Sequence, residues 1–266
     1  MTAATRTRVL LAIWTALIVA FLLAPIVLIA LYAFNPSNVQ SWPLGGLSTK
    51  WFSQTFHNEE MRQALWLSVR AALIATGIAM LLGSAAAFAV HRFRFFGREA
   101  VSYVIVLPLA LPGIITGMAL NSFFAFGNVS FSLATIVVGH ATFCIVTVYN
   151  NLLARLRRTQ PSLIEASMDL GADGWQTFRH VTLPSIATAL VAGGLLAFAL
   201  SFDEVVVTLF TAGSQQTLPL WIYNQFRLPN TAAEVNAVAV FVILLTAIPV
   251  YLAQRLMRDT GGITGR

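Results

Sequence analysis

Asp203 and Glu204 are adjacent carboxylates in an otherwise apolar part of the sequence, which makes them the best candidates for binding a charged substrate. A charge in the middle of a membrane helix costs at least about 2.5–3.5 kcal/mol, so it is expected to face water or a cation. Neighbouring residues on a helix point about 100° apart, so only one of the two can point at a given site. We predict that Asp203 is that residue; the alternatives are an ion pair with Arg70 or a protonated, inert carboxyl.

The residues around these carboxylates suit a substrate that carries amines. Ser201 and Phe202 precede them, and Trp221 follows in the next apolar stretch. A carboxylate pairs with an ammonium group, and an aromatic ring adds a cation–π contact. We therefore expect Ser201, Phe202, Asp203, Glu204 and Trp221 to line a substrate path.

Neither catalysis nor metal binding is expected. An aspartyl enzyme needs two carboxyls about 3 Å apart, and no other apolar run carries a second acid for Asp203. One cysteine, Cys144, cannot form a cysteine-based metal cage. The histidines, which lack metal-ligand spacing, are His57, His91, His140 and His180.

The composition places these residues in a membrane. Of the 266 residues, 58% are hydrophobic and 10% are charged, whereas soluble domains average about 45–50% and about 25%. The formal net charge of +6 includes no Lys/Arg-rich run of the kind that binds nucleic acid. These values predict an integral membrane protein.

Six apolar runs are long enough, or nearly so, to cross about 30 Å of hydrocarbon as helices. Their approximate ranges are 9–34, 64–90, 101–126, 131–153, 185–211 and 235–253. We therefore predict an all-α fold in which residues 1–266 form a single transmembrane domain. The first run is too long for the core of a cleavable signal peptide, so it is expected to be retained.

The third run contains helix-disturbing residues at Pro108, Pro112, Gly113 and Gly117. Such residues free backbone groups where membrane helices break around a substrate path. These four positions are predicted to form a gate or hinge.

The positions of the basic residues predict the orientation. Of the 16 lysines and arginines, only Lys50, Arg62, Arg70 and Arg227 fall on one set of loops, and the remaining twelve fall on the other. Cytoplasmic loops carry the excess of Lys and Arg. Both termini are therefore expected in the cytoplasm.

The cytoplasmic loop of residues 155–184 is predicted to contain two short helices. Pro161 suits the first turn of a helix, and Gly171 suits its end. Trp175 and Phe178 share one face of a second helix, which Pro184 should end or kink before the fifth run.

The acidic residues of this loop favour a protein partner. An amphipathic helix that rests on anionic lipid is usually basic, but this loop carries Glu165, Asp169 and Asp173. The loop is therefore expected to bind another protein and not the lipid surface.

The same loop resembles the EAA motif of permease subunits of ABC-type importers. Glu165-Ala166-Ser167 is followed after three residues by Gly171 and after nine more by Val181-Thr182-Leu183-Pro184, which is the family spacing. Ser167 and Val181 replace the Ala and Ile of the family pattern. The resemblance implies a type I ABC importer permease whose coupling helix docks on an ATPase. The implied coupling residues are Glu165, Ala166, Ser167, Asp169, Gly171, Leu183 and Pro184.

The chain is not expected to bind ATP itself. A phosphate-binding loop needs a lysine after a Gly-rich turn, and the only lysine, Lys50, lies in an outer loop. No cofactor is expected on this chain; ATP and Mg are expected on the partner ATPase.

Four further segments are similar to the second permease of spermidine/putrescine importers. They are residues 41–52, 201–206, 217–220 and 233–237. This resemblance implies a polyamine substrate and location in the bacterial inner membrane. The implied partners are a second permease, an ATPase dimer and a periplasmic binding protein, and Trp42 and Trp51 are expected to help dock the last of these.

Two alternatives remain open from the sequence. Related importers of thiamine, phosphonates, ferric iron and opine- or amino-acid-like compounds share much of the pattern. A secondary transporter driven by an ion gradient should show internal repeats; none is evident, and that class does not explain the cytoplasmic loop.

Overall fold

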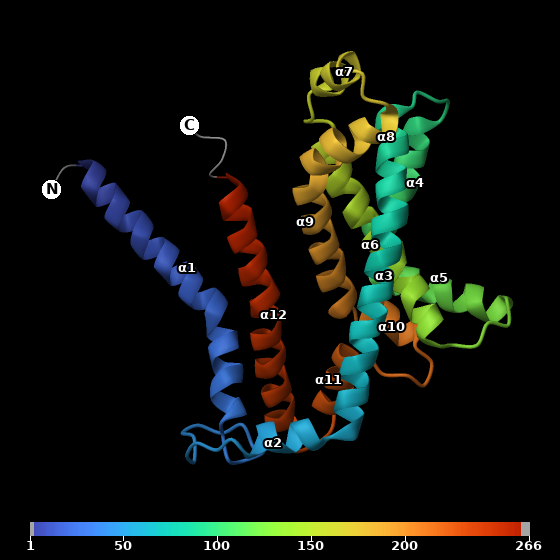
Figure 1. The fold of residues 1–266 in the computed structure, drawn as a ribbon. Coiled ribbons are helices and arrows are strands. Elements are labelled where there is room, and N and C mark those ends of the chain that lie inside the picture. Colours follow the sequence, from blue (N-terminus) through green and yellow to red (C-terminus); the bar gives the residue numbers. More distant parts are fainter. Residues whose placement is uncertain (1–2, 262–266) are drawn as a thin grey trace. The chain divides into compact units, whose positions relative to one another are not determined.

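A computed structural model describes residues 3–261, with side chains described for residues 7–247. Every regular element in these residues is a helix, in agreement with the predicted all-α class (Figure 1). The chain divides into two compact units. The first unit combines the segment up to Arg62 with Ile222–Leu256, and the second consists mainly of Gln63–Trp221.

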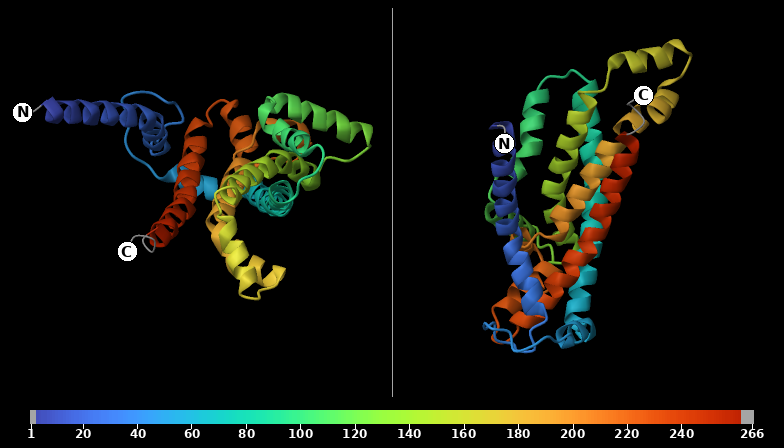
Figure 2. Two further views of the ribbon diagram at one scale, coloured as in Figure 1. Left: turned by 90° about the horizontal axis from the view of Figure 1, so that it is seen from above. Right: turned by 90° about the vertical axis from the view of Figure 1, so that its left-hand side faces the viewer.

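The second unit is built around the long helix α6. Its elements are α3 (Glu59–Arg92), α4 (Arg98–Ala110), α5 (Gly113–Phe126), α6 (Leu133–Leu156), α7 (Pro161–Asp169), α8 (Gly174–Thr177), the π-helical turn η1 (Phe178–Thr182), α9 (Leu183–Phe202), α10 (Val206–Thr211) and α11 (Leu218–Phe226). The first residues of α3 and the last residues of α11 belong to the first unit. The helices α3, α6 and α9 run alongside one another (Figures 1 and 2). Helix α6 also contacts α4, α5, α9 and α10. It therefore borders both helices that flank Asp203 and Glu204.

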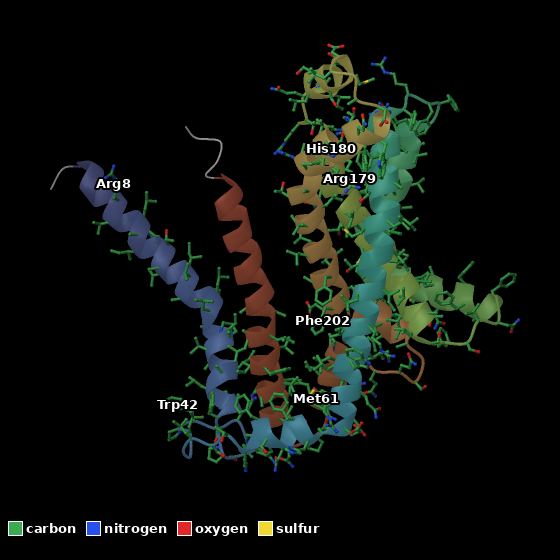
Figure 3. All side chains as sticks on the ribbon, viewed as in Figure 1. Arg8, Trp42, Met61, Arg179, His180 and Phe202 are labelled. Carbon is green, nitrogen blue, oxygen red and sulfur yellow. The ribbon has the colours of Figure 1, made fainter. Side chains whose placement is uncertain are left out.

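The first unit contains α1 (Ala3–Ala33), α2 (Lys50–His57) and α12 (Ala232–Gly261). Trp51 of α2 packs with Ala233 and Ala237 of α12, and its indole N–H donates to the Asn35 carbonyl oxygen at 2.7 Å. Trp42, in the segment between α1 and α2, is 75% exposed (Figure 3).

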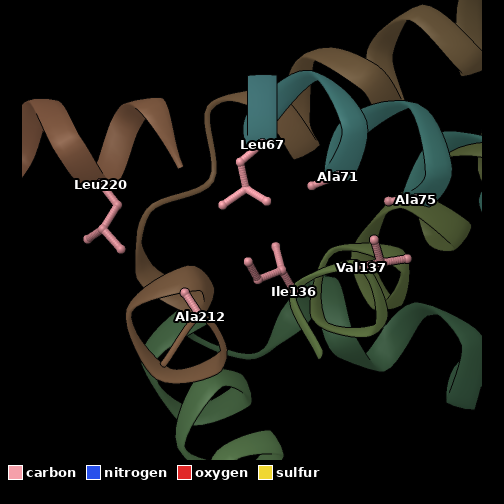
Figure 4. Close-up of a cluster of buried hydrophobic side chains, with 7 residues drawn as sticks. All are labelled: Leu67, Ala71, Ala75, Ile136, Val137, Ala212 and Leu220. Carbon is pink, nitrogen blue, oxygen red and sulfur yellow. The ribbon is translucent and has the colours of Figure 1, made fainter. Parts of the chain in front are cut away.

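Small residues bring the helices of the second unit close together. Leu67, Ala71 and Ala75 of α3 pack against Ile136 and Val137 of α6 (Figure 4). Further along α3, a Cβ on Gly83 would lie 2.8 Å from the carbonyl oxygen of Ile145, so only glycine fits there without a shift. Small residues are enriched at helix contacts in membranes because apolar side chains gain little there by leaving lipid.

Four helical segments in the described residues are long and apolar enough to cross a membrane. They are Thr7–Ala33, Glu59–Arg92, Leu133–Leu156 and Gly174–Phe202. These correspond to the first, second, fourth and fifth predicted spans. The sixth predicted span falls in α12, whose apolar part in the described side chains is Ala232–Ala247; its remainder lies outside them, so six crossings stay a prediction.

The third predicted span, 101–126, is not one continuous helix. Helices α4 and α5 meet at a bend of 104°, and the pair would count as a fifth crossing. Leu111, between them, has extended backbone angles, because a residue that precedes proline is pushed out of the helical region. The break therefore lies at Leu111 and Pro112, whereas Pro108 stays within α4.

The fifth predicted span, 185–211, also ends earlier than expected. Helix α9 stops at Phe202, residues 203–205 are not helical, and the short helix α10 follows. Asp203 and Glu204 therefore occupy a break between two helices, and the prediction of carboxylates within one continuous helix is wrong.

Candidate functional site

The break between α9 and α10 gives its two carboxylates different environments. The Glu204 side chain is half-buried, and its Oε1 accepts the backbone N–H of Val207 at 2.8 Å. Asp203 is exposed, and its carboxylate has no partner among the described side chains. Glu204 therefore stabilises the start of α10, while the Asp203 carboxylate stays exposed; that it binds a cation remains a prediction.

The His140 side chain of α6 lies within hydrogen-bond distance of both helices that flank this break. Its Nδ1 lies 2.8 Å from the Ser201 hydroxyl at the end of α9, and its Nε2 lies 2.8 Å from the Thr208 hydroxyl of α10. The single hydroxyl hydrogen of Thr208 is donated to the Glu204 carbonyl oxygen at 2.7 Å. In a neutral ring, Nε2–H therefore donates to Thr208, and Nδ1 accepts the Ser201 hydroxyl hydrogen.

Nothing in the spacing of the sequence points to a role for His140. It is 1% exposed, and a buried imidazole needs partners for both nitrogens. The sequence does show a histidine in one apolar run and two hydroxyl residues, Ser201 and Thr208, in another, which are possible hydrogen-bond partners. The pairing itself depends on the contact between α6 and the α9–α10 break.

Replacing His140 with Leu should lower the thermal stability of the chain. The change leaves the buried Ser201 hydroxyl without its partner, and an unpaired buried group costs about 1–3 kcal/mol. Thr142→Val is the matched control, because the Thr142 hydroxyl donates only to Gly139 in its own helix. Equal melting temperatures for the two variants in detergent would contradict the role of His140.

Helix α5 packs against α10 directly behind the break. The Asn121 amide donates to the Phe210 carbonyl oxygen at 2.7 Å. A Cβ on Gly117 would lie 2.6 Å from the Phe210 ring, and one on Gly113 would meet Val206 at 3.6 Å. The predicted gate residues Gly113 and Gly117 therefore bring the bent segment against the helix that follows Asp203.

Three of the predicted substrate-path side chains are buried. Ser201 is turned toward His140, Phe202 stacks on Phe198 of the same helix, and Trp221 is 1% exposed. The expectation that these side chains line an open path is not supported, since none presents appreciable surface. At this break, the exposed predicted residue is Asp203.

The first helix of the 155–184 loop ends as predicted. Gly171 has φ = +84°, a left-handed conformation that favours glycine. Its N–H donates to Met168, and the N–H of Ala172 donates to Ser167; this is the Schellman pattern of a helix C-terminus. Asp173 then caps α8 by accepting the N–H of Gln176 at 2.8 Å.

Aromatic and hydroxyl contacts attach this loop to the second unit. The Phe178 ring packs on Phe88 of α3 with 5.8 Å between centroids, and Trp175 stacks on Phe178 at 5.7 Å. The Ser167 and Thr177 hydroxyls lie 3.1 Å apart, which joins α7 to α8. Figure 1 shows α7 beyond the ends of α6 and α9.

The outer face of α7 combines charge with exposed apolar side chains. Glu165, Ala166 and Asp169 are exposed, and Leu170 is 89% exposed beside them. Among Glu165, Ala166 and Ser167, only Ser167 is half-buried. Such a mixed surface fits a protein partner, and docking on an ATPase stays a prediction.

Pro184 does not end the helix before the fifth span. The helical segment runs without interruption from Gly174 to Phe202, and Leu183 begins α9. A proline ring clashes with the carbonyl four residues before it. The π-helical turn of η1, in which the Leu183 N–H bonds to the Phe178 carbonyl oxygen, widens the helix at this point. Figure 3 places Arg179 and His180 near the loop and Phe202 at the far end of α9.

Trp42 and Trp51 have different environments. Trp42 is exposed and remains a docking candidate. Trp51 is 9% exposed, with its N–H bonded to Asn35 and the Lys50 ammonium 4.3 Å from its ring centroid. The expectation that Trp51 docks a binding protein is not supported, because its ring helps form the core of the first unit.

The chain matches a known family and is similar to named permeases. Residues 79–260 match the family described as binding-protein-dependent transport system inner membrane component. The spermidine/putrescine transport system permease protein PotC of Escherichia coli is 34% identical over 251 residues, which cover 93% of this chain and 94% of the relative. The putrescine transport system permease protein PotI of Escherichia coli is 36% identical over 246 residues, which cover 89% and 86%.

The fold is also found in solved structures. A chain of a bacterial alginate ABC transporter, in complex with alginate pentasaccharide-bound periplasmic protein, superimposes with a TM-score of 0.70. It is 15% identical, and the match covers 96% of each chain, so the likeness concerns the fold alone. Since the family match spans most of the chain and both permeases align over nearly its whole length, this protein belongs to the binding-protein-dependent transport system inner membrane component family and is a multi-pass inner-membrane transport subunit, not an enzyme.

Proposed function

We propose that this protein is a permease subunit of an ATP-driven importer for a small polyamine of the spermidine/putrescine class. The observation that carries the proposal is the exposed carboxylate of Asp203, which lies unpaired at a break between two helices. Broken helices form substrate sites in transporters, and a free carboxylate selects a cation. The similarity to the PotC and PotI permeases supports the same substrate class.

Three kinds of partner complete the proposed importer. A second permease forms the other side of the substrate path, an ATPase dimer binds at the coupling loop, and a periplasmic binding protein delivers the substrate. The solved alginate transporter complex, which contains a periplasmic protein, supports this arrangement. Both termini and the 155–184 loop lie in the cytoplasm, as the distribution of arginine indicates.

The loop of residues 155–184 couples ATP hydrolysis to transport in this proposal. ATP and Mg are held by the partner ATPase, whose closure draws the α7 helices of the two permeases together. Movement of α7 is transmitted to α3 through the Phe178–Phe88 contact and to α9 through the continuous Gly174–Phe202 helix. The path then opens outward for the polyamine, and hydrolysis resets it inward, so two sites bias one two-state element.

Transport by the reconstituted complex tests this function. Vesicles that contain both permeases and the ATPase should take up labelled putrescine or spermidine only with the binding protein and ATP. Uptake that continues without ATP and collapses with an uncoupler would identify a secondary transporter instead. Stimulation of the ATPase by thiamine, a phosphonate or ferric iron, but not by a polyamine, would reject the substrate class.

A further inference from the structure

A cavity of about 480 Å³ lies in the second unit, where α3, α4 and the end of α6 meet. It is separate from the α9–α10 break, and none of its residues belongs to α7, α8 or η1. Its residues come from the end of α3, the first turns of α4 and Arg157, which follows α6. The proposed transport function leaves this cavity unexplained.

The polar side of the cavity carries uncompensated positive charge. Arg98 and Arg157 line it together with a single acid, Glu99, so one positive charge has no counter-charge in the lining. Neither arginine forms an ion pair or a side-chain hydrogen bond in the described part of the chain, and Glu99 does not reach either of them. Guanidinium groups bind phosphate oxygens well, since they offer several N–H donors in a planar fork.

The other side of the cavity is apolar, and hydrogen bonds join α4 to α6 beside it. Val90 and Val106 line it, and both pack into the hydrophobic cluster between α3, α4 and α6. The Tyr149 hydroxyl donates to Ser102 at 2.8 Å, and Ser102 donates to the Arg98 carbonyl oxygen at 3.1 Å. These hydrogen bonds hold Ser102 between Tyr149 of α6 and the first turn of α4. The lining passes from two arginines to apolar side chains, in the same order as the headgroup and acyl chains of a phospholipid.

The loop that leads into α4 has the composition of a membrane interface. Phe93, Phe95 and Phe96 are exposed large apolar residues, and they alternate with Arg92 and Arg94. Aromatic rings and arginines together anchor a segment at headgroup depth. The predicted orientation places this loop at the cytoplasmic leaflet, where basic pockets between helices bind anionic lipid.

We propose that this cavity binds the phosphate-bearing headgroup of an anionic phospholipid from the cytoplasmic leaflet. Arg98 and Arg157 contact the phosphate, and Val90 and Val106 contact the first part of the acyl chains. The exposed Tyr103 lies at the rim. A free phosphate ion shares the polar contacts but not the apolar ones, so the two ligands are separable by experiment.

Lipid retention by the full chain in nanodiscs tests the site. The nanodiscs contain phosphatidylcholine alone or phosphatidylcholine with phosphatidylglycerol, and native mass spectrometry counts the bound phosphatidylglycerol. Arg98→Gln and Arg157→Gln should each weaken retention roughly fivefold, since an arginine near the surface contributes about this much to binding of anionic lipid. Arg158→Gln is the matched control, because this neighbour of Arg157 does not line the cavity.

Two further measurements separate lipid binding at this cavity from misfolding and from the binding of free phosphate. Val106→Trp fills the apolar wall without changing any charge, and it should lower retention even if an arginine variant fails to fold. Inorganic phosphate should not displace the lipid. Equal losses from Arg158→Gln and Arg157→Gln, displacement by inorganic phosphate, or disappearance of the lipid when the partner ATPase binds would each overturn the proposal.

Discussion

Asp203→Asn should lower polyamine uptake by about ten- to a hundredfold while the complex still assembles. A hydrogen bond to a charged group contributes about 1.5–3 kcal/mol, and each 1.4 kcal/mol is about a factor of ten. Asparagine keeps the size of the side chain but cannot pair with an ammonium group. Because Asp203 is exposed and no described side chain bonds to it, its loss should leave the fold intact.

Glu204→Gln is the matched control at the neighbouring carboxylate. Glutamine keeps an oxygen that can accept the Val207 N–H, so α10 should still begin correctly and uptake should fall far less. The measurements are initial uptake rates of labelled putrescine and the yield of assembled complex. Equal uptake by Asp203→Asn and the unmodified protein would remove the argument for charge recognition at this break.

Gly171→Val should separate ATP hydrolysis from uptake. At φ = +84° a side chain with a Cβ costs roughly 1–2 kcal/mol, and a β-branched one tolerates this conformation poorly. Nothing lies within 4 Å of a Cβ built on Gly171, so the strain comes from the backbone and not from crowding. The end of α7 should therefore change direction, and uptake for each ATP hydrolysed should fall about tenfold or more.

Gly171→Asn distinguishes backbone conformation from side-chain volume. Asparagine adopts the left-handed conformation more readily than valine, so it should retain most of the coupling although it is as large. Uptake and ATP hydrolysis are measured on the same vesicles, together with substrate capture by the binding protein, which should not change. Normal coupling in Gly171→Val would show that the end of α7 does not transmit the movement.

Local signals in the 155–184 loop predicted the start and the end of its first helix. Pro161 begins α7, and Gly171 ends the helix in a left-handed conformation. These features depend on residues within one or two turns, and the spacing from Glu165 to Pro184 identified the family. Ser167 and Thr177 contribute a contact between the two short helices that spacing could not predict.

The roles of the substrate-path residues depended on distant contacts. Asp203 and Glu204 look equivalent in the sequence, but a hydrogen bond to Val207 occupies one of them and leaves the other free. His140 acquires its role only because α6 lies beside Ser201 and Thr208. The burial of Trp51 and Trp221, which are 9% and 1% exposed, likewise could not be read from their positions in the sequence.

The sequence by itself determined the all-helical membrane class, the limits of the first helix in the 155–184 loop and the family, because composition, hydropathy and short spacings are local properties of the chain. Only the tertiary structure decided where the third and fifth predicted spans break, which carboxylate is free and which polar side chains are paired. The physical reason is that buried polar groups near a helix break need hydrogen-bond partners, and several of these partners come from helices distant in the sequence. Here Asn121 bonds to Phe210 and His140 bonds on both sides of the α9–α10 break, and these partners lie 61 to 89 residues apart in the chain.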